Sequence, residues 1–292
     1  MDYYLLTDLA ARVGYHLALS GAETFRVEET IRRIIGAYGI ECEAFSIPNC
    51  VMVSLEAANG KPLMVMKRVG FHGNDLEALE KLNALKFKSL HYTNALGTDL
   101  TVELPEGHIW EAGNDVTLSG QEYIANIPTE ELFTSPLKTG VNGVVYASLP
   151  LVHDGNIIDG FHFVVKDGKI VEARARQGEE TLQAAIAVDE GASYFGEVAL
   201  VPYDSPISNQ KILFYNTLFD ENAACHIAFG EAYPCLEGGQ KMTKEELKAR
   251  GLNDSITHVD FMVGTPDLRI VGTTHDGREI PVFENGNFAQ GF

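Results

Sequence analysis

The stretch Gly196-Glu197-Val198-Ala199-Leu200-Val201 indicates the fold most clearly, because a single carboxylate precedes an unbroken run of apolar residues. Such a short apolar run is typical of a buried β-strand. Glu197 then lies at the start of that strand, where its carboxylate can reach a cleft. We therefore expect a strand at residues 198–201, with Glu197 beside a binding site.

Short strand-like runs recur on both sides of this segment, separated by turns of Gly, Asn and Asp. From Lys86 onward the further expected strands are 101–104, 144–149, 161–165, 259–263 and 280–283. Pro281 cannot donate a hydrogen bond within a sheet, so the last of these has to be an edge strand. Helices are fewer, and they are expected at about 181–189, 221–229 and 243–249. Residues 86–292 are thus predicted to form a mixed, strand-rich α/β domain.

Residues 1–85 have a different pattern, which predicts a small α+β unit. Apolar residues at helical spacing indicate helices, and Ser20-Gly21-Ala22-Glu23 has the Ser-x-x-Glu spacing of a capping box. Two strand-like runs are joined through Asn59-Gly60, a strong hairpin signal. The expected elements are helices at 5–18, around 27–35 and at 75–85, and strands at 50–56 and 62–67. We place the boundary between this unit and the larger domain at Lys86.

The composition excludes several classes of partner. A net charge of -19 argues against nucleic acid and against anionic membranes, because both are polyanions. No apolar run approaches the ~20 residues that span a bilayer, and Met1-Asp2-Tyr3-Tyr4 lacks the basic start of a secretory signal. The cysteines have no C-x2-C spacing, so neither a zinc ribbon nor a disulfide framework is indicated. We therefore expect a cytoplasmic protein.

Metal-ligating residue types gather in segments 126–134, 189–201, 220–226 and 258–260. His258 and Asp260 are two residues apart in an expected strand, so both side chains point to the same side. His226 is expected on a helix, with Tyr233 two turns later if that helix continues. Mixed nitrogen and oxygen donors suit Zn or Co, or Mn at lower affinity. From spacing alone, however, solvated charges, polar pairing and helix packing explain these residues better than a dinuclear site.

Longer motifs favour the metal site. Residues from Phe87-Lys88-Ser89-Leu90-His91-Tyr92 to the C-terminus resemble the aminopeptidase T family of metallo-aminopeptidases. The shared motifs occur in the family's order: Asn-Ile-Pro-Thr-Glu-Glu at 126–131, Gly-Glu-Val-Ala-Leu-Val at 196–201, Asp-Glu-Asn-Ala-Ala-Cys-His at 220–226 and His-Val-Asp-Phe-Met at 258–262. The resemblance implies an enzyme that removes N-terminal residues from peptides at a dinuclear metal site.

Carried over from that family, the implied metal ligands are Glu131, Glu197, His226, Tyr233, His258 and Asp260, with Glu130 as the alternative to Glu131. The implied mechanism uses two divalent ions, Zn, Co or Mn, which share Glu197 and a bridging water. The implied catalytic groups are Glu197, Tyr233 as donor to the oxyanion, and Glu130 or Glu190 as general base. Peptide substrates are the implied partners, and a homodimer is also possible.

The N-terminal unit resembles another family. Residues 19–31, Leu-Ser-Gly-Ala-Glu-Thr-Phe-Arg-Val-Glu-Glu-Thr-Ile, are similar to the N-terminal cytoplasmic segment of the threonine/serine exporter family, whose transmembrane helices are absent here. The chain therefore looks like a fusion without the larger N-terminal α/β domain of aminopeptidase T proteins, and its site could bind metal but turn over poorly. Further alternatives are a transport-associated module and a different two-metal hydrolase, such as an amidase or a phosphatase.

Overall fold

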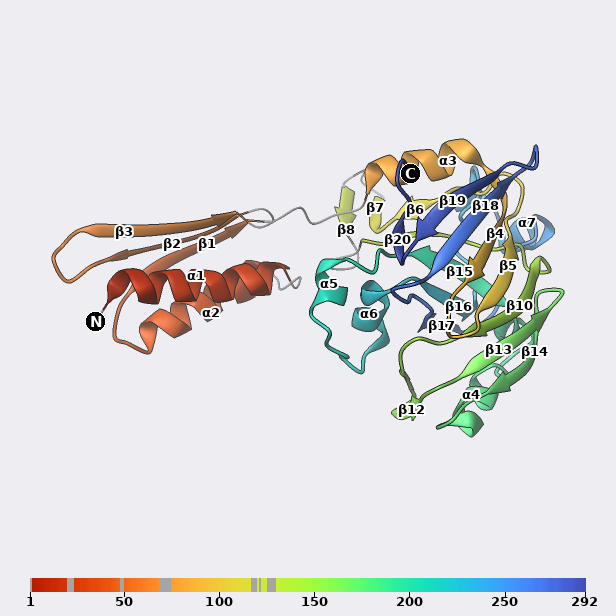
Figure 1. The fold of residues 1–292 in the computed structure, drawn as a ribbon, viewed down its shortest axis with the longest axis horizontal. Coiled ribbons are helices and arrows are strands. Elements are labelled where there is room, and N and C mark those ends of the chain that lie inside the picture. The colour runs from red at the N-terminus through yellow and green to blue at the C-terminus, as the bar shows by residue number, and fades with distance from the viewer. Residues whose placement is uncertain are drawn as a thin grey trace. The chain divides into compact units, whose positions relative to one another are not determined.

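The computed structural model describes residues 2–19, 24–47, 50–68, 75–116, 120, 122–124 and 130–292. The chain divides into two compact units, Met1–Gly73 and Asn74–Phe292, each with its own hydrophobic core (Figure 1). The mixed, strand-rich α/β class is confirmed. The expected capping box at 20–23 and residues 126–129 of the first motif lie outside the described residues.

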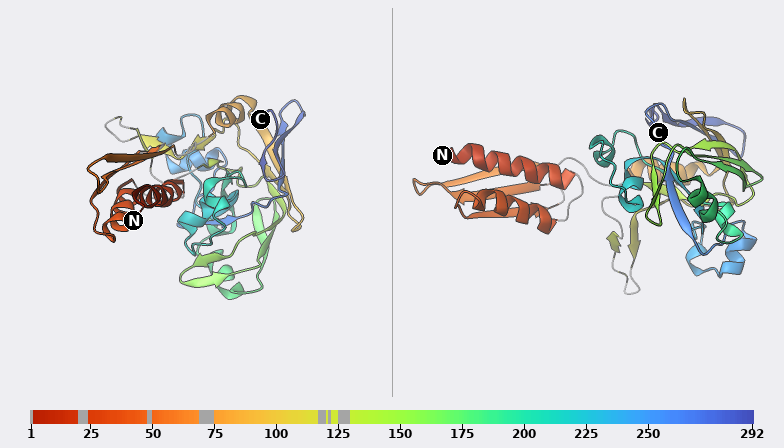
Figure 2. Two further views of the ribbon diagram at one scale, coloured as in Figure 1. Left: turned by 60° about the vertical axis from the view of Figure 1, so that its left-hand side comes forward. Right: turned by 90° about the horizontal axis from the view of Figure 1, so that it is seen from below.

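The first unit is a layer of helices on one face of a sheet. Helices α1 (Tyr3–Leu19) and α2 (Thr24–Gly36) cover the same face of an antiparallel sheet with the order β1-β2-β3, as Figures 1 and 2 show. Its strands are β1 (Cys42–Ile47), β2 (Cys50–Glu56) and β3 (Pro62–Arg68). The predicted helices and the β2–β3 hairpin are confirmed, and β1 is an addition to the prediction.

The second unit contains two larger antiparallel sheets. The eight-stranded sheet has the order β14-β13-β10-β5-β4-β18-β19-β20 and consists of β4 (Phe87–Thr93), β5 (Asp99–Glu103), β10 (Val141–Tyr146), β13 (His162–Lys166), β14 (Lys169–Arg174), β18 (Arg269–Thr274), β19 (Glu279–Glu284) and β20 (Asn287–Phe288). The five-stranded sheet has the order β17-β16-β15-β9-β6 and consists of β6 (Glu111–Ala112), β9 (Leu132–Thr134), β15 (Phe195–Leu200), β16 (His226–Gly230) and β17 (His258–Met262).

Two small hairpins and short helices complete the second unit. The hairpins are β7 (Asn114–Val116) with β8 (Glu122–Ile124) and β11 (Leu151–His153) with β12 (Asn156–Ile158). The helices are α3 (Leu76–Leu85), α4 (Glu179–Ala185), α5 (Pro206–Asn209), α6 (Thr217–Asp220), α7 (Lys244–Ala249) and the 3-10 turns η1 (Gly191–Ser193), η2 (Glu221–Ala223) and η3 (Gly239–Lys241).

Helix α3 belongs to the second unit. Ala78 and Leu82 are fully buried in its core, and the Asn83 amide exchanges hydrogen bonds of 2.9 Å with the backbone N–H and C=O of Trp110. The boundary expected at Lys86 is therefore corrected to a position before this helix.

Phenylalanine rings join the two sheets of the second unit. Phe163 of β13 lies at the centre, with its ring centroid 6.2 Å from Phe195, 5.9 Å from Phe229 and 5.2 Å from Phe261, which belong to β15, β16 and β17. Aromatic rings at these distances and tilted angles pack favourably. The core therefore holds one face of the five-stranded sheet rigidly against its neighbour, and the opposite face is free to carry polar side chains.

Most predicted elements of this unit are found, but the helix predicted at 221–229 is wrong. Its residues form η2 and then β16, all of whose residues are buried. A strand buried on both faces has no alternation of apolar and polar residues, so its pattern does not separate it from a buried helix. The strand predicted at 280–283 is β19, and it is second from the edge of the sheet because β20 lies outside it. The strand β20 pairs only with Phe283 and Glu284. Pro281 lies beyond that short ladder and forms no pair with β20.

His108 gives this unit a dependence of stability on pH. Burial lowers the pKa of His108 to about 4, and its Nδ1 lies 3.1 Å from the Pro105 carbonyl oxygen. Because the unfolded chain binds this proton from pH ~6.5 downward and the folded chain only near 4, the contribution of His108 to stability is lost as pH falls through this window.

Between pH 7 and pH 5, the unfolding free energy of the wild-type protein should fall by about 2 kcal/mol more than that of the His108→Gln variant. Fluorescence of the single tryptophan, Trp110, which is buried in the second unit, reports urea unfolding. His91→Gln is the control, because the side chain of His91 is 43% exposed. Equal pH slopes in the protein and His108→Gln would contradict the prediction.

Candidate metal centre

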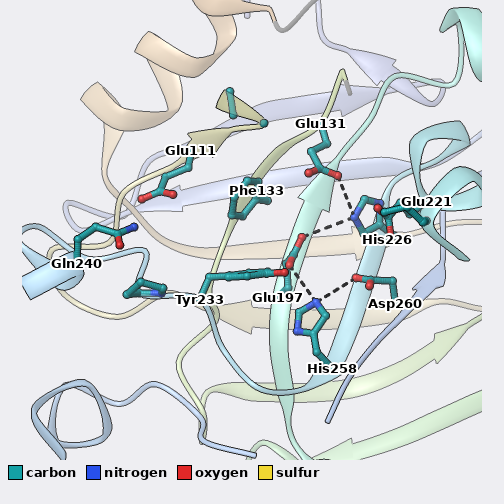
Figure 3. Close-up of a pocket in the computed structure, with 14 residues that line it drawn as sticks. Glu111, Glu131, Phe133, Glu197, Glu221, His226, Tyr233, Gln240, His258 and Asp260 are labelled. Atoms are coloured by element: carbon teal, nitrogen blue, oxygen red, sulfur yellow. Dashed lines mark ion pairs between the residues drawn. The ribbon is translucent and has the colours of Figure 1, made fainter. Parts of the chain in front are cut away.

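Four polar side chains lie on the face of the five-stranded sheet opposite the phenylalanine core. Alternate residues of β15, β16 and β17 enter the core. Among the residues between them, Glu197, His226, His258 and Asp260 line a cavity of about 440 Å³ (Figure 3). Ala228 of β16 pairs with both Glu197 and Asp260, so a small side chain separates the two carboxylates. The strand predicted at 259–263 is confirmed as β17, and His258 and Asp260 both face the cavity.

Gly196 allows Glu197 to point into this cavity. In a regular strand Phe195 and Glu197 would lie on the same face. The pairing with β16 shifts between these two residues, so Gly196 is the extra residue of a β-bulge. Phe195 therefore enters the core while Glu197 faces the cavity. The strand begins at Phe195, so Glu197 lies within it. The prediction of a strand that begins after Glu197 is corrected accordingly.

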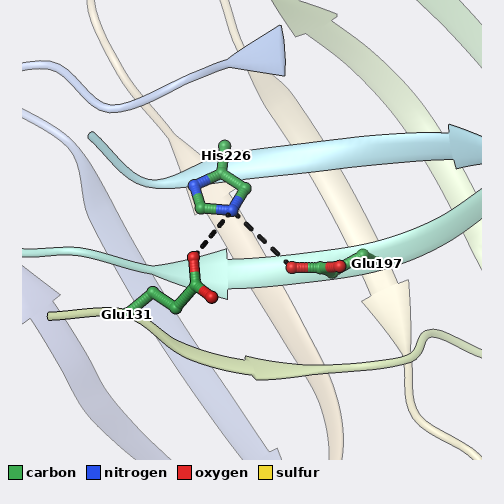
Figure 4. Close-up of side chains that lie close together, drawn as sticks. All are labelled: Glu131, Glu197 and His226. Carbon is green, nitrogen blue, oxygen red and sulfur yellow. Dashed lines mark ion pairs between the residues drawn. The ribbon is translucent and has the colours of Figure 1, made fainter. Parts of the chain in front are cut away.

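The first donor cluster joins β15, β16 and the residue that precedes β9. Glu131, immediately before β9, has its Oε2 3.4 Å from Nε2 of His226, and Oε1 of Glu197 lies 3.6 Å from the same nitrogen (Figure 4). Glu197 and His226 are 4% and 1% exposed. The ligand atoms of these three residues all lie within 4.8 Å of one another.

The second cluster contains the other oxygen of Glu197. Nε2 of His258 lies 3.3 Å from Oε2 of Glu197 and 3.5 Å from Oδ1 of Asp260. These three ligand atoms again lie within 4.8 Å of one another. Glu197 is thus the member that both clusters share, with one oxygen directed to each.

Backbone contacts orient both imidazoles. Nδ1 of His226 lies 3.1 Å from the Ala224 carbonyl oxygen, and Nδ1 of His258 lies 2.8 Å from that of Glu231. Each Nδ1 therefore donates a proton to a carbonyl and leaves Nε2 facing the carboxylates, the orientation that metal-binding histidines adopt. The strands and their connecting turns thus fix the ring orientation in advance.

The carboxylates of both clusters favour positive charge beside them. Burial acts to lower the pKa of His226, but Glu131 and Glu197 outweigh it and raise this pKa well above 6.5. Burial likewise opposes protonation of His258, yet Asp260 and Glu197 raise its pKa to about 11. A divalent cation supplies positive charge to every donor of a cluster at once. One imidazole nitrogen with two carboxylates suits Zn, Co or Mn, so the residues present fit such ions.

We expect Gly196→Ala to destabilise the second unit by about 1–3 kcal/mol and to weaken its affinity for Co²⁺. A Cβ at this position would lie 2.2 Å from the Glu231 carbonyl oxygen, so the bulge would have to move and Glu197 with it. Gly36→Ala is the matched control, because no atom lies within 4 Å of its added Cβ. Urea unfolding followed by Trp110 fluorescence and Co²⁺ titration measure the two effects. Unchanged Co²⁺ affinity would contradict the positioning role of the bulge.

Tyr233 lies at the wall of the cavity and not on a helix. It belongs to the irregular segment after β16, and its ring centroid is 5.0 Å from that of His258 and 5.6 Å from that of Phe133. Burial and the surrounding carboxylates, Glu197 first among them, raise the pKa of its hydroxyl. Tyr233 therefore keeps its proton and can donate it in a hydrogen bond.

Glu221 is a cavity residue that the sequence prediction does not include. It lies in η2, it is buried, and burial raises the pKa of its carboxyl to about 8. The motif Asp-Glu-Asn at 220–222 contains the signal, but the sequence does not say which carboxylate turns inward. Asp220 instead accepts hydrogen bonds from the backbone N–H groups of Phe214 and Asn216.

The other two candidate carboxylates lie elsewhere. Glu131 lines the cavity and Glu130 does not. Burial raises the pKa of Glu130 to about 7, with the Ser205 side chain as its hydrogen-bond partner. Glu190 is exposed beside η1. The structure therefore brings Glu131 and not Glu130 into the donor cluster, and it brings Glu221 to the cavity in place of Glu190.

A strand-rich α/β domain with two donor clusters that share one carboxylate has the donor arrangement typical of metal-dependent hydrolases. The chain belongs to the thermophilic metalloprotease (M29) family, whose model matches residues 71–288. Aminopeptidase AmpS of Bacillus subtilis (strain 168) is 53% identical over 214 residues, which cover 73% of this chain and 52% of the relative. Aminopeptidase 2 of Geobacillus stearothermophilus is 52% identical over 212 residues, 72% of this chain and 51% of the relative.

A solved structure, wild-type AmpT from Thermus thermophilus, matches with a TM-score of 0.68 and 44% identity over 73% of this chain and 53% of that one. The chain thus spans about half the length of the relatives it matches. Residues 8–94 match a second family, described as putative threonine/serine exporter, so both resemblances are confirmed. No helix among the described residues is long and apolar enough to cross a membrane.

Proposed function

We propose that the second unit is a metal-dependent aminopeptidase that hydrolyses N-terminal residues from peptides at a two-cation site. The sharing of Glu197 between two donor clusters is the observation that supports this proposal most strongly. Glu131, Glu197 and His226 would hold one ion, and Glu197, His258 and Asp260 the other. Relatives that match this part of the chain are named aminopeptidases.

Two divalent cations, when bound, supply Lewis acidity that polarises a scissile carbonyl and activates water. The protein residues around them divide the remaining tasks. Tyr233, which keeps its proton, donates a hydrogen bond to the oxygen on which charge develops. Glu221 accepts or returns a proton at its carboxylate, in the general acid–base role that the sequence prediction gives to Glu130 or Glu190.

The cavity favours the charged end of a peptide. Its carboxylates attract a cationic α-amino group, which restricts the reaction to the N-terminus of a chain. Phe133 and Leu218 line the same cavity and supply apolar walls that exclude water around the substrate side chain. Figure 3 shows Glu111 and Gln240 at the end of the cavity away from His226 and Asp260.

The test is release of p-nitroaniline from leucine p-nitroanilide after Zn²⁺, Co²⁺ or Mn²⁺ is added to metal-stripped protein. Metal-dependent release with two ions bound per chain supports the proposal. Absence of both release and metal binding would contradict the assignment of the site.

A second candidate is a protein that binds metal without efficient turnover. The observation in its favour is that residues 8–94 match a different family, so the aminopeptidase-like unit is joined to a unit of another kind. Two bound ions per chain without hydrolysis of any tested aminoacyl p-nitroanilide would favour this candidate over the enzyme.

We expect Glu221→Gln to lower kcat by about 10²-fold or more while both metal ions remain bound, because it removes a proton-exchanging group and no proposed ligand. Initial rates and metal content measure the two quantities. Glu190→Gln, a change at an exposed carboxylate, should leave both unchanged. A wild-type rate in Glu221→Gln would exclude the acid–base role.

A further inference from the structure

The outer face of the sheet in the first unit is exposed and largely apolar. Successive side chains of β1, β2 and β3 point to opposite faces of the sheet, so every second residue points away from helices α1 and α2. The strand register brings these residues into three rows that cross all the strands: Glu43–Ser54–Met64, Phe45–Met52–Met66 and Ile47–Cys50–Arg68. The pair Glu56–Pro62 follows at the end of the face beside Ser54 and Met64. Phe45, Met64 and Met66 are 52%, 66% and 63% exposed.

This face has no covering layer among the described residues of the first unit. Helices α1 and α2 pack on the opposite face, through the core that contains Val51, Val53 and Val65 (Figure 2). A sheet with an apolar face is stable when another element covers that face, and exposed patches of Met and Phe mark interaction surfaces. The face also lies outside residues 71–288, the part of the chain that matches the metalloprotease family.

We propose that two copies of this chain dimerise through this face, sheet against sheet, around a two-fold axis that makes their strands cross at a large angle. Near-orthogonal packing is one of the two common ways in which sheets stack. A two-fold dimer requires a surface that is complementary to itself. The arrangement of charge and of side-chain size on this face meets that requirement in one orientation.

The charges determine the orientation. Glu43 and Arg68 stand at diagonally opposite corners of the three rows, on β1 and β3. An axis along the other diagonal, from Met64 to Ile47, places Glu43 of each copy over Arg68 of the other. This axis lays the strands of one copy across those of the other, so two different spacings face each other. Alternate residues along a strand are ~6.7 Å apart and neighbouring strands ~4.8 Å. Long charged side chains such as those of Glu43 and Arg68 can span the difference.

The same axis pairs large side chains with small ones. Phe45 of one copy faces Cys50 of the other, and Met66 faces Ser54, so the two layers interlock. Met52, in the centre of the face, meets its own counterpart.

Other in-plane axes fit less well. An axis along the strands places Glu43 over Met64, and one across the strands places it over Ile47. The remaining diagonal brings Glu43 against Glu43. Only the axis through Met64 and Ile47 therefore pairs opposite charges.

Sedimentation of the full-length chain at micromolar concentrations tests the proposal. We expect a dimer whose dissociation constant rises about tenfold or more in Met66→Glu, because a charge enters the apolar middle row of the face. Leu9→Glu is the matched control, because Leu9 is 54% exposed on α1, on the other side of the unit. A chain that stays monomeric, or equal effects of the two variants, would overturn the proposal.

Charge reversal tests the orientation. Glu43→Arg and Arg68→Glu should each weaken the dimer about tenfold or more, because like charges then face each other across the axis. The double variant, with both reversals, should restore the wild-type dissociation constant. A double variant no tighter than the single ones would exclude this axis.

Discussion

Glu197→Gln should reduce hydrolysis of leucine p-nitroanilide by about 10³-fold or more and lower the number of metal ions bound per chain. Glu197 directs one oxygen toward His226 and the other toward His258, at 3.6 and 3.3 Å from their Nε2 atoms. Glutamine keeps the shape of the side chain but carries no charge and has a single acceptor oxygen. Neither cluster then keeps both of its carboxylates, so one change disables both.

The measurement combines initial rates with saturating Co²⁺ or Zn²⁺ and the metal content after gel filtration. Glu245→Gln, a change at an exposed residue of α7, should match the wild type in both. Full activity in Glu197→Gln would show that the shared-ligand assignment is wrong.

The strand pattern of the second unit was largely predictable from the sequence, and β16 shows where the prediction failed. In β17, polar His258 and Asp260 alternate with buried residues, which gives the two-residue period of a strand with one polar face. The residues around His226 lack this period because both faces of β16 are buried. Helix α3 illustrates a different limit, since its helical period does not say which of two cores its apolar face joins.

The site was less predictable than the fold. The resemblance indicated the residues of both clusters, whereas spacing alone favoured ordinary polar packing for them. The choice between Glu130 and Glu131 depends on which adjacent side chain turns toward the cavity, and the direction of Glu197 depends on the bulge at Gly196. Glu221 reaches the cavity because residues 221–223 form the short turn η2, which ends before β16. The sequence pattern predicted a longer helix over this stretch. All three depend on tertiary register, which residue types do not encode locally.

Phe163→Ala should destabilise the second unit by about 3–5 kcal/mol, the usual cost of removing a buried phenylalanine ring. Phe163 is fully buried, and its ring contacts those of Phe195, Phe229 and Phe261 across the two sheets. These partners belong to the three strands that carry Glu197, His226, His258 and Asp260 on their other face. The cavity left by the ring would therefore loosen the support of both donor clusters.

Urea unfolding followed by Trp110 fluorescence measures this loss for the second unit. Phe219→Ala is the control, because its ring is 47% exposed, and its effect should stay within about 0.5 kcal/mol. If the core positions the clusters as well as stabilising the fold, Phe163→Ala should also weaken Co²⁺ binding under conditions where the unit remains folded. Loss of stability with unchanged Co²⁺ affinity would mean instead that hydrogen bonds such as that between His258 Nδ1 and the Glu231 carbonyl hold the clusters in place without the aromatic layer.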